Sequence, residues 1–334
     1  MNHTDSEKLS TSSATTGEHH PVLYRCALAT AVVALLPIVV GALVTARDAG
    51  MAFPDWPTSD GHGMFAYPWL QSAGNKFLEH GHRLAGILIG VCSIGLMTLA
   101  LLKERRAWVC AAAALVLAAV IAQGLLGAQR VRLDERTLAM VHGSFAALVF
   151  ALMVSVASFT SRAWFSGGFE RSNIDVRSLK PLVLATPLLV FAQYVLGGFV
   201  RHLGTALYEH IALAVLVLLF VIATFIVVYR TGISWLRKSA VMLLSVVIVQ
   251  VLLGVGTWIT RFGLASTGYV AVQYSSEQIV LRTAHTVVGL LLFATSVVVA
   301  LRVFRYESVR KDRLGSFKGS QHVPHVVSAE GCLR

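Results

Sequence analysis

The feature that most constrains this chain is a series of eight apolar runs, each long enough to cross a bilayer as a helix of about 20 residues. Their approximate spans are residues 26–46, 82–102, 108–129, 137–160, 181–200, 207–229, 238–260 and 282–304. A transmembrane β-barrel would need alternating polar and apolar residues in segments of about 10, and these runs do not alternate. The sequence therefore predicts an all-α membrane protein with eight transmembrane helices.

Composition agrees with this interpretation. Of the 334 residues, 56% are hydrophobic and only 13% are charged, whereas soluble domains have about 25% charged residues. The net charge of +11 would suit a nucleic-acid-binding protein, but the basic residues lie in short loops and in the C-terminal tail. That is the distribution of cationic cytoplasmic loops in a membrane protein, so we expect no nucleic-acid partner.

The basic loops also predict orientation. Unmatched Lys and Arg follow the second, fourth, sixth and eighth runs, so we expect both termini in the cytoplasm, with the chain in a bacterial inner membrane. The predicted organisation is a disordered tail (1–24), an N-terminal four-helix bundle (25–162), a cytoplasmic linker (163–180), a C-terminal four-helix bundle (181–306) and a cytoplasmic tail (307–334).

An internal repeat links the eight runs. The odd-numbered runs end in small residues followed by arginine, and three of them contain Gln-x-x-x-Gly, which begins at Gln123, Gln193 and Gln250. Each even-numbered run carries one histidine near its start, namely His82, His142, His210 and His285. The repeat predicts a helical hairpin used four times, arranged as two pseudo-symmetric four-helix bundles.

The four histidines suggest a ligand. A lone histidine in an apolar helix is more often a packing residue, but four at equivalent positions of a repeat point to a shared role. Facing helices of a bundle commonly hold cofactors, and imidazole is a common axial ligand of haem iron. The pairs would be His82 with His142 and His210 with His285. Zinc or a di-iron centre is poorly supported, because no carboxylate lies near His142 and no Cys-His cluster exists.

Arginines at the helix mouths suit the propionates of such a ligand, because guanidinium groups bind carboxylates in bidentate fashion. The candidates are Arg47, Arg83, Arg130, Arg201, Arg261 and Arg282. The alternative for each arginine is ordinary snorkelling to the membrane interface.

The stretch Glu79-His80-Gly81-His82-Arg83 distinguishes the two halves. Polar residues at the mouth of a membrane helix are costly and are therefore functional candidates. On a helix, Glu79 shares a side with His82 and Arg83, while His80 points about 160° away from His82. Since only His82 has an acid one turn earlier on its own face, Glu79 is predicted to act as a general base or to stabilise a carbocation. The alternative is a structural Glu79–Arg83 ion pair.

The long outer loop after the first run holds Asp55 and Trp56 between two prolines. This sequence predicts a stiff turn, with Trp56 either at the membrane interface or over the mouth of the site. The loop from about 262 to 281 is the expected counterpart in the second half.

Together these motifs resemble the haem A synthase family. The resemblance extends over essentially all eight helices and rests on Glu79-x-x-His82-Arg83, Pro54-Asp55-Trp56-Pro57, the Gln-x-x-x-Gly helix ends and the four histidines. It implies an oxidoreductase acting on a CH group, which oxidises a methyl group of haem O to a formyl by successive hydroxylations. The product would be haem A for terminal oxidases.

The resemblance also implies roles for individual residues. Glu79 looks like the essential catalytic acid, His82 and His142 look like ligands of the substrate haem, and His210 and His285 look like axial ligands of a resident haem b. Supporting positions would be Arg83, Arg47, Arg130, Arg201, Asp55 and Trp56. The implied partners are haem O, a membrane electron acceptor and the haem O synthase, a prenyltransferase, and a homo-oligomer is compatible with the sequence.

The cysteines depart from the family pattern. Many members carry outer-loop cysteines just before the Pro-Asp-Trp turn, where this chain has Phe53. Its cysteines at positions 26, 92, 110 and 332 form no Cys-x-x-Cys pair, and no two share a loop. We therefore expect neither a disulfide framework nor a Cys-ligated metal.

Two other classes compete with the enzyme. A haem-carrying electron-transfer or haem-handling membrane protein would use the same four histidines but would not need Glu79. A transporter would explain the repeat, but transporters usually break their helices at the site, and these apolar runs are intact. The oxidising enzyme is the preferred interpretation.

Overall fold

The computed structural model describes residues 18–166 and 175–320. In this part of the chain the backbone is helical apart from its loops, which contain two isolated β-bridges. Eight of the described helices are long and apolar enough to cross a membrane. The prediction of an all-α, multi-pass membrane protein is confirmed.

The membrane-spanning helices follow one another through short connections, apart from the loops 47–73 and 263–275 and the segment 161–179. They are α1 (Pro21–Ala46), α2 (Gly74–Lys103), α3 (Ala107–Leu133), α4 (Arg136–Thr160), α6 (Lys180–Gly198), α7 (Leu207–Arg230), α8 (Ser234–Phe262) and α9 (Ser276–Ser320). The short helical elements are η1 (Trp69–Gln71), α5 (Arg162–Ser166), η2 (Val176–Leu179), η3 (Phe199–Leu203) and η4 (Ala265–Thr267), of which η3 is a π-helical turn.

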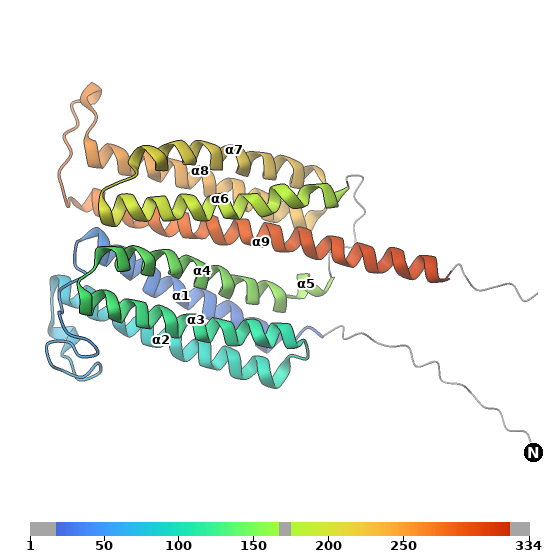
Figure 1. Ribbon diagram of the computed structural model, residues 1–334, viewed down its shortest axis with the longest axis horizontal. Helices are drawn as coiled ribbons and strands as arrows, with labels where there is room; N and C mark the ends of the chain where they lie inside the picture. Colours follow the sequence, from blue (N-terminus) through green and yellow to red (C-terminus); the bar gives the residue numbers. More distant parts are fainter. Residues whose placement is uncertain (1–17, 167–174, 321–334) are drawn as a thin grey trace, which may run out of the picture.

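The helices form two four-membered rings that lie side by side (Figure 1). In the first bundle each of α1 to α4 packs on the next, and α4 closes the ring on α1; α6 to α9 repeat this arrangement. The bundles meet through α1 and α4 on one side and α6 and α9 on the other. The predicted pair of pseudo-symmetric bundles is present, because the first and the last helix of each ring form the interface in both halves. In this arrangement α1 corresponds to α6, and α4 corresponds to α9.

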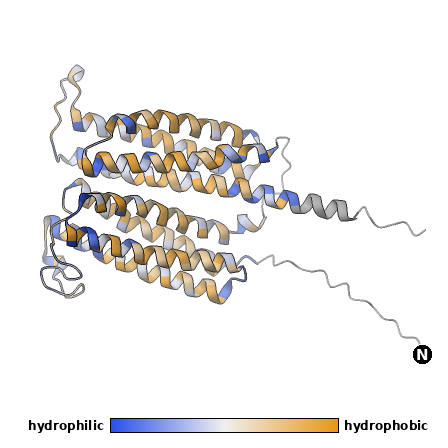
Figure 2. Cartoon of the chain, in the orientation of Figure 1, coloured by the Kyte–Doolittle hydropathy of each residue, from blue (hydrophilic) through white to orange (hydrophobic). Residues whose placement is uncertain are grey.

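Apolar residues make up most of the middle of both bundles, and hydrophilic residues gather at their two ends (Figure 2). Buried residues such as Leu23, Leu96, Met153, Leu243 and Leu290 fill the space between helices. Many other apolar side chains stay exposed on the outer faces of the helices, where lipid would replace water as their solvent.

The loops 47–73 and 263–275 lie at the same end of the molecule, opposite the start of α1 and the far end of α9 (Figure 1). An even number of crossings explains why the start of α1 and the end of α9 lie on one side. The assignment of that side to the cytoplasm stays a prediction.

The ends of the helical region differ from the predicted boundaries. Helix α1 begins at Pro21, before residue 25, because proline is well tolerated in the first helical turn. Helix α9 continues to Ser320, past the predicted bundle end at 306. Its extension is anchored by Glu307, which is 4% exposed and pairs with Lys180 and, one turn on, with Lys311. Sequence polarity alone gave no sign of this buried acid.

Parts of three other predictions lie outside the described residues. These are most of the N-terminal tail (1–17), the centre of the linker (167–174) and the end of the C-terminal tail (321–334), which includes Cys332. The described cysteines, Cys26, Cys92 and Cys110, are free thiols.

Candidate functional site

The four histidines form two pairs of nearly identical geometry. His82 on α2 faces His142 on α4, with ring centroids 6.3 Å apart and planes at 80°. His210 on α7 faces His285 on α9 at 6.3 Å and 82°. Each pair joins two non-adjacent helices of one ring, so each bundle holds two imidazoles across its interior near the end that carries the long loops.

A glycine on the preceding helix lies against each histidine ring. A methyl group built at Gly41 would lie 2.7 Å from Cε1 of His82. At Gly127, Gly197 and Gly254 it would lie 3.1 Å from Cε1 of His142, His210 and His285, respectively. Because ordinary carbon contacts begin near 3.4 Å, only glycine lets the imidazoles pack this closely on the neighbouring backbone. The repeated small residue at each helix exit therefore has a structural reason.

The glutamine of the Gln-x-x-x-Gly motif contacts the same histidine. Gln123 donates to the His142 carbonyl at 3.0 Å, and its Nε2 lies 3.3 Å from the ring Nε2. Gln193 makes the equivalent contacts with His210, at 2.9 Å to the carbonyl and 3.1 Å to Nδ1. Gln250 lies 3.5 Å from the ring of His285. The first hairpin has Pro37 at this position, so His82 lacks such a partner.

Several polar atoms around the pairs are buried without a hydrogen-bond partner among the described residues. They include the amide oxygens of Gln123, Gln193 and Gln250. The rings of His82, His142 and His285, in contrast, contact the backbone of Pro37, Gln123 and Gln250 on the preceding helix. Buried polar atoms are normally paired, so the unpaired amide oxygens at both sites point to a ligand that completes them.

The pair geometry fits one metal ion between two imidazoles. Metal–nitrogen bonds of about 2 Å, with each nitrogen about 1 Å from its ring centre, would place the centroids about 6 Å apart. The observed 6.3 Å agrees. No group of three or more His, Cys, Asp or Glu side chains forms a metal site in the described residues. An ion held here would therefore take its remaining ligands from a macrocycle such as porphyrin.

Glu79 is buried at the mouth of the first bundle and is fully engaged. Its side chain is 5% exposed, and Oε1 accepts a hydrogen bond from Arg83 at 2.8 Å. Oε2 accepts the backbone N–H groups of Ala52 at 2.7 Å and of Phe53 at 3.2 Å. The structural ion pair named as the alternative is present, and the same carboxylate also holds the loop 47–73.

Arg83 and His80 hold the following part of that loop. Arg83 donates to the carbonyls of Asp55 and Thr58 at 3.1 and 2.7 Å. His80 is 1% exposed, its Nδ1 lies 3.0 Å from the Ser59 hydroxyl, and its ring lies 4.7 Å from that of Tyr67. These contacts make the start of α2 the main support of the loop.

This arrangement refines the helical-face prediction. Glu79 lies between the two histidines on the helical wheel, about 60° from His82 and about 100° from His80. The loop covers the side of Glu79, Arg83 and His80, while His82 turns toward Gly41 and His142. His82 and His80 point in different directions, as predicted. Glu79, His80 and Arg83 anchor the loop, and His82 alone points into the bundle.

Asp55 shapes the loop. Its carboxylate accepts the N–H groups of Asp60 at 3.1 Å and Gly61 at 2.9 Å. Although partial desolvation acts in the opposite direction, hydrogen bonds from Thr58, Gly61 and Asp60 lower the pKa of Asp55 to about 2. Trp56 is 38% exposed on the loop surface. The predicted turn is therefore present, and Asp55 acts within it.

The helix-mouth arginines have different environments. Arg83 serves the loop, Arg261 donates to Gln273 at 2.7 Å, and Arg47 is exposed. Arg130 donates to the carbonyl of Gly50, and Arg201 reaches from the second bundle to the carbonyl of Ala42 on α1 at 2.9 Å. The sixth candidate, Arg282 on α9, is half-buried. The six arginines thus separate into peripheral and interfacial members.

His202 was not anticipated from the sequence. It lies on the π-helical turn η3, and its Nε2 is 3.9 Å from a methyl built at Gly143, the residue after His142. No other hairpin has a histidine at this position, so the repeat could not identify it. The only local signal is its place directly after Arg201.

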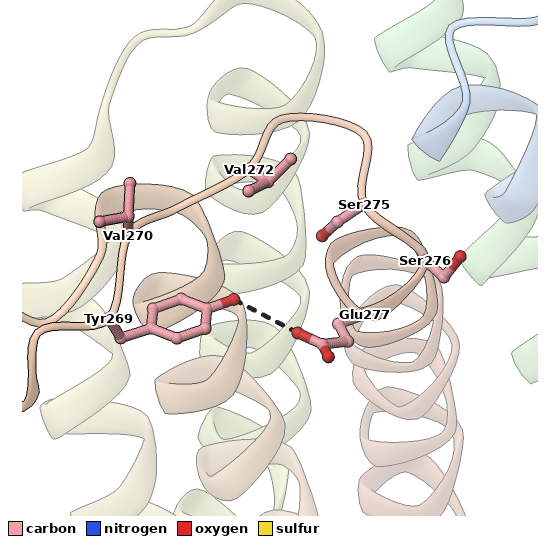
Figure 3. A pocket seen from close by; sticks show the side chains of 6 residues that line it. All are labelled: Tyr269, Val270, Val272, Ser275, Ser276 and Glu277. Carbon is pink, nitrogen blue, oxygen red and sulfur yellow. Dashed lines mark hydrogen bonds between the residues drawn. The ribbon is translucent and has the colours of Figure 1, made fainter.

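The loop of the second half, residues 263–275, is anchored by the buried side chain of Gln278, which accepts the N–H group of Tyr274 and donates to the carbonyl of Thr260. Its hollow of about 300 Å³ is lined by Tyr269, Val270, Val272, Ser275, Ser276 and Glu277 (Figure 3). The Tyr269 hydroxyl donates to Glu277 at 3.3 Å. Desolvation and the neighbouring Glu277 carboxylate raise the pKa of Tyr269. None of the paired histidines lines this hollow, so it does not extend the histidine sites.

The fold and site define a class: an integral multi-pass membrane protein made of two four-helix bundles, with one histidine pair in each. Residues 68–210 match the model of the COX15-CtaA family, described as cytochrome oxidase assembly protein. The matched stretch includes Glu79, Arg83 and the histidines at 82, 142 and 210. No curated protein matches the sequence in a direct comparison.

Proposed function

We propose that this protein is a haem A synthase, which oxidises a methyl group of haem O to a formyl by successive hydroxylations. The observation that carries the proposal is the pair of imidazoles, repeated with the same 6.3 Å separation in both bundles. The family description as a cytochrome oxidase assembly protein supports it, because haem A serves terminal oxidases.

The two histidine pairs receive different roles in this proposal. His82 and His142 hold the iron of the substrate, haem O, beneath the anchored loop 47–73. His210 and His285 hold a resident haem b. That haem, when bound, supplies a route by which electrons leave the substrate site. The protein residues orient both ligands, through the glycine and glutamine contacts that fix the imidazole rings.

Glu79 is the proposed catalytic acid. Of its two predicted roles, stabilising positive charge suits the geometry better than accepting a proton, because three donors already occupy the carboxylate. Arg83 and the loop amides fix its position at the bundle mouth. The same contacts hold the loop over that mouth, where it limits access of water.

The proposed setting is a bacterial inner membrane with both termini in the cytoplasm, which places the two long loops on the outer side. A membrane electron acceptor would take up the electrons, and the haem O synthase would supply the substrate. The apolar outer faces of the bundles are compatible with a homo-oligomer.

One observation favours a second function. Because Glu79 is fully occupied as a loop anchor, the site also suits a bis-histidine haem carrier or electron-transfer protein without oxidation chemistry of its own. Such a protein would need the histidine pairs and the loop, but not the charge of Glu79.

Expression in a host that makes haem O, followed by extraction and separation of the pigments, distinguishes the two functions. The enzyme predicts haem A with the wild type and its loss with Glu79→Gln, which keeps the size of the side chain. Glu135→Gln is the matched control and should keep haem A production, because this exposed glutamate directly precedes α4 at the same end of the first bundle. Haem A production unaffected by Glu79→Gln, or haem O left unchanged by the wild type, would favour the carrier.

A further inference from the structure

The interface between the bundles holds a cluster of basic side chains at the level of the histidine pairs. This interface cluster consists of Arg130, Arg201, His202 and Arg282. The residues come from α3, η3 and α9, so both bundles contribute. Arg201 and His202 are close enough to Arg130 and Arg282 for their charges to interact.

The cluster lies directly beside the first histidine pair. Arg201 donates to Ala42 at 2.9 Å, next to the glycine that supports His82. His202 lies near Gly143, next to His142. The charge of Arg130 acts on both His82 and His142. Tyr194 links the cluster to the second bundle. It lies close enough to Arg201 for their charges to interact, and its ring packs beside Gly289, as the side chain of Gln250 does.

Protein carboxylates act on the cluster only over a longer range than an ion pair, as Asp134 does on Arg130 and Asp48 on Arg282. No ion pair in the described part of the chain includes Arg130, Arg201 or Arg282. Glu79 interacts with Arg130 over a longer range, but its oxygens are already held by Arg83 and the loop. Grouping like charges away from bulk water is costly unless an anion joins them.

We propose that the interface cluster is an anion site, shared by the two bundles, that binds the carboxylate groups of the porphyrin held by the neighbouring histidine pair. Guanidinium groups suit this ligand because they pair with carboxylates in bidentate fashion. The other helix-mouth arginines are excluded, because Arg83 is already paired with Glu79 and both Arg47 and Arg261 are exposed. This inference rests on the proposed function only in assuming that a porphyrin binds.

The consequence is that the carboxylate edge of the ligand points toward the other bundle. A π-helical turn, of the kind often found at functional sites, supplies two of the four members. This gives η3 a role that the helical-hairpin repeat does not require. It also makes the interface between the bundles part of the binding site.

The test compares ferric protoporphyrin with its dimethyl ester, which has the same ring but no carboxylates. Full-length protein produced under haem limitation and placed in nanodiscs would be titrated with each, and binding followed by the low-spin absorption spectrum. We expect the diacid to bind the wild type about tenfold more tightly than the diester. Arg201→Gln should remove most of that preference and Arg201→Lys should restore part of it.

Arg132→Gln is the matched control, because this exposed arginine lies on the same helix as Arg130 and carries the same charge. It should keep the preference, whereas Arg130→Gln should reduce it. Equal affinity of the wild type for diacid and diester would overturn the proposal and favour a lipid phosphate as the occupant. Equal weakening of both ligands by Arg201→Gln would also overturn it. A protein that shows the preference but leaves haem O unoxidised would keep the anion site and lose the proposed enzyme activity.

Discussion

Replacing the glycine beside His82 or His142 by alanine should displace the imidazole ring, and the displacement should grow with the steric overlap between the added methyl group and the ring. To reach 3.4 Å, the lower limit of ordinary contact, the ring of His142 must retreat by about 0.3 Å in Gly127→Ala, and that of His82 by about 0.7 Å in Gly41→Ala. Metal–ligand distances tolerate only about 0.2 Å. Gly41→Ala should therefore lower the affinity for haem O by about 10- to 100-fold, and Gly127→Ala by less.

The matched control lies on the same helix as Gly127. A methyl at Gly124 meets nothing within 4 Å, so Gly124→Ala should retain the pigment and gain up to about 1 kcal/mol of helix stability. The assay is the sum of haem O and haem A per protein after purification from a host that makes haem O, with thermal unfolding measured in parallel. If all three variants kept the same pigment content, the close packing of imidazole on glycine would have no bearing on ligand binding.

The remaining predictions concern the second pair and the anchored loop. His285→Ala should remove the resident haem b, and a purified variant with an unchanged low-spin spectrum would contradict that assignment. Arg83→Gln leaves the buried carboxylate of Glu79 without its cation, at a cost of about 3 kcal/mol, so chymotrypsin should cut loop 47–73 faster than in the wild type; an equal rate would refute the anchor. Because the pKa of Asp55 is lowered to about 2, the carboxylate should stabilise the loop fully above about pH 4. The stability difference from Asp55→Asn, followed by the tryptophan fluorescence of the loop, should vanish as the pH falls toward 2, and a difference that persists there would contradict this pKa.

The sequence predicted the features that follow from hydrophobicity and repetition. The eight spans and the two bundles could be recognised because a membrane helix must be long and apolar. The facing of His82 with His142, and of His210 with His285, followed from equivalent positions in a repeated hairpin. The function of these pairs as haem ligands stays a prediction, although their geometry suits it.

What escaped prediction depends on contacts between distant segments. The helical wheel placed His82 with Glu79, but it could not show that the loop covers the His80 side. Nor could it show that Glu79 accepts hydrogen bonds from Ala52 and Phe53, more than 20 residues away. His202 was missed because it lies on a π-helical turn that interrupts the repeat.

The most direct test of the central claim is the identity of the pigment made in a host that supplies haem O. The wild type should yield haem A, and His82→Ala should leave haem O unconverted while the resident haem b spectrum remains. A wild type that carries haem b but leaves haem O unchanged would contradict the claim that this protein oxidises it.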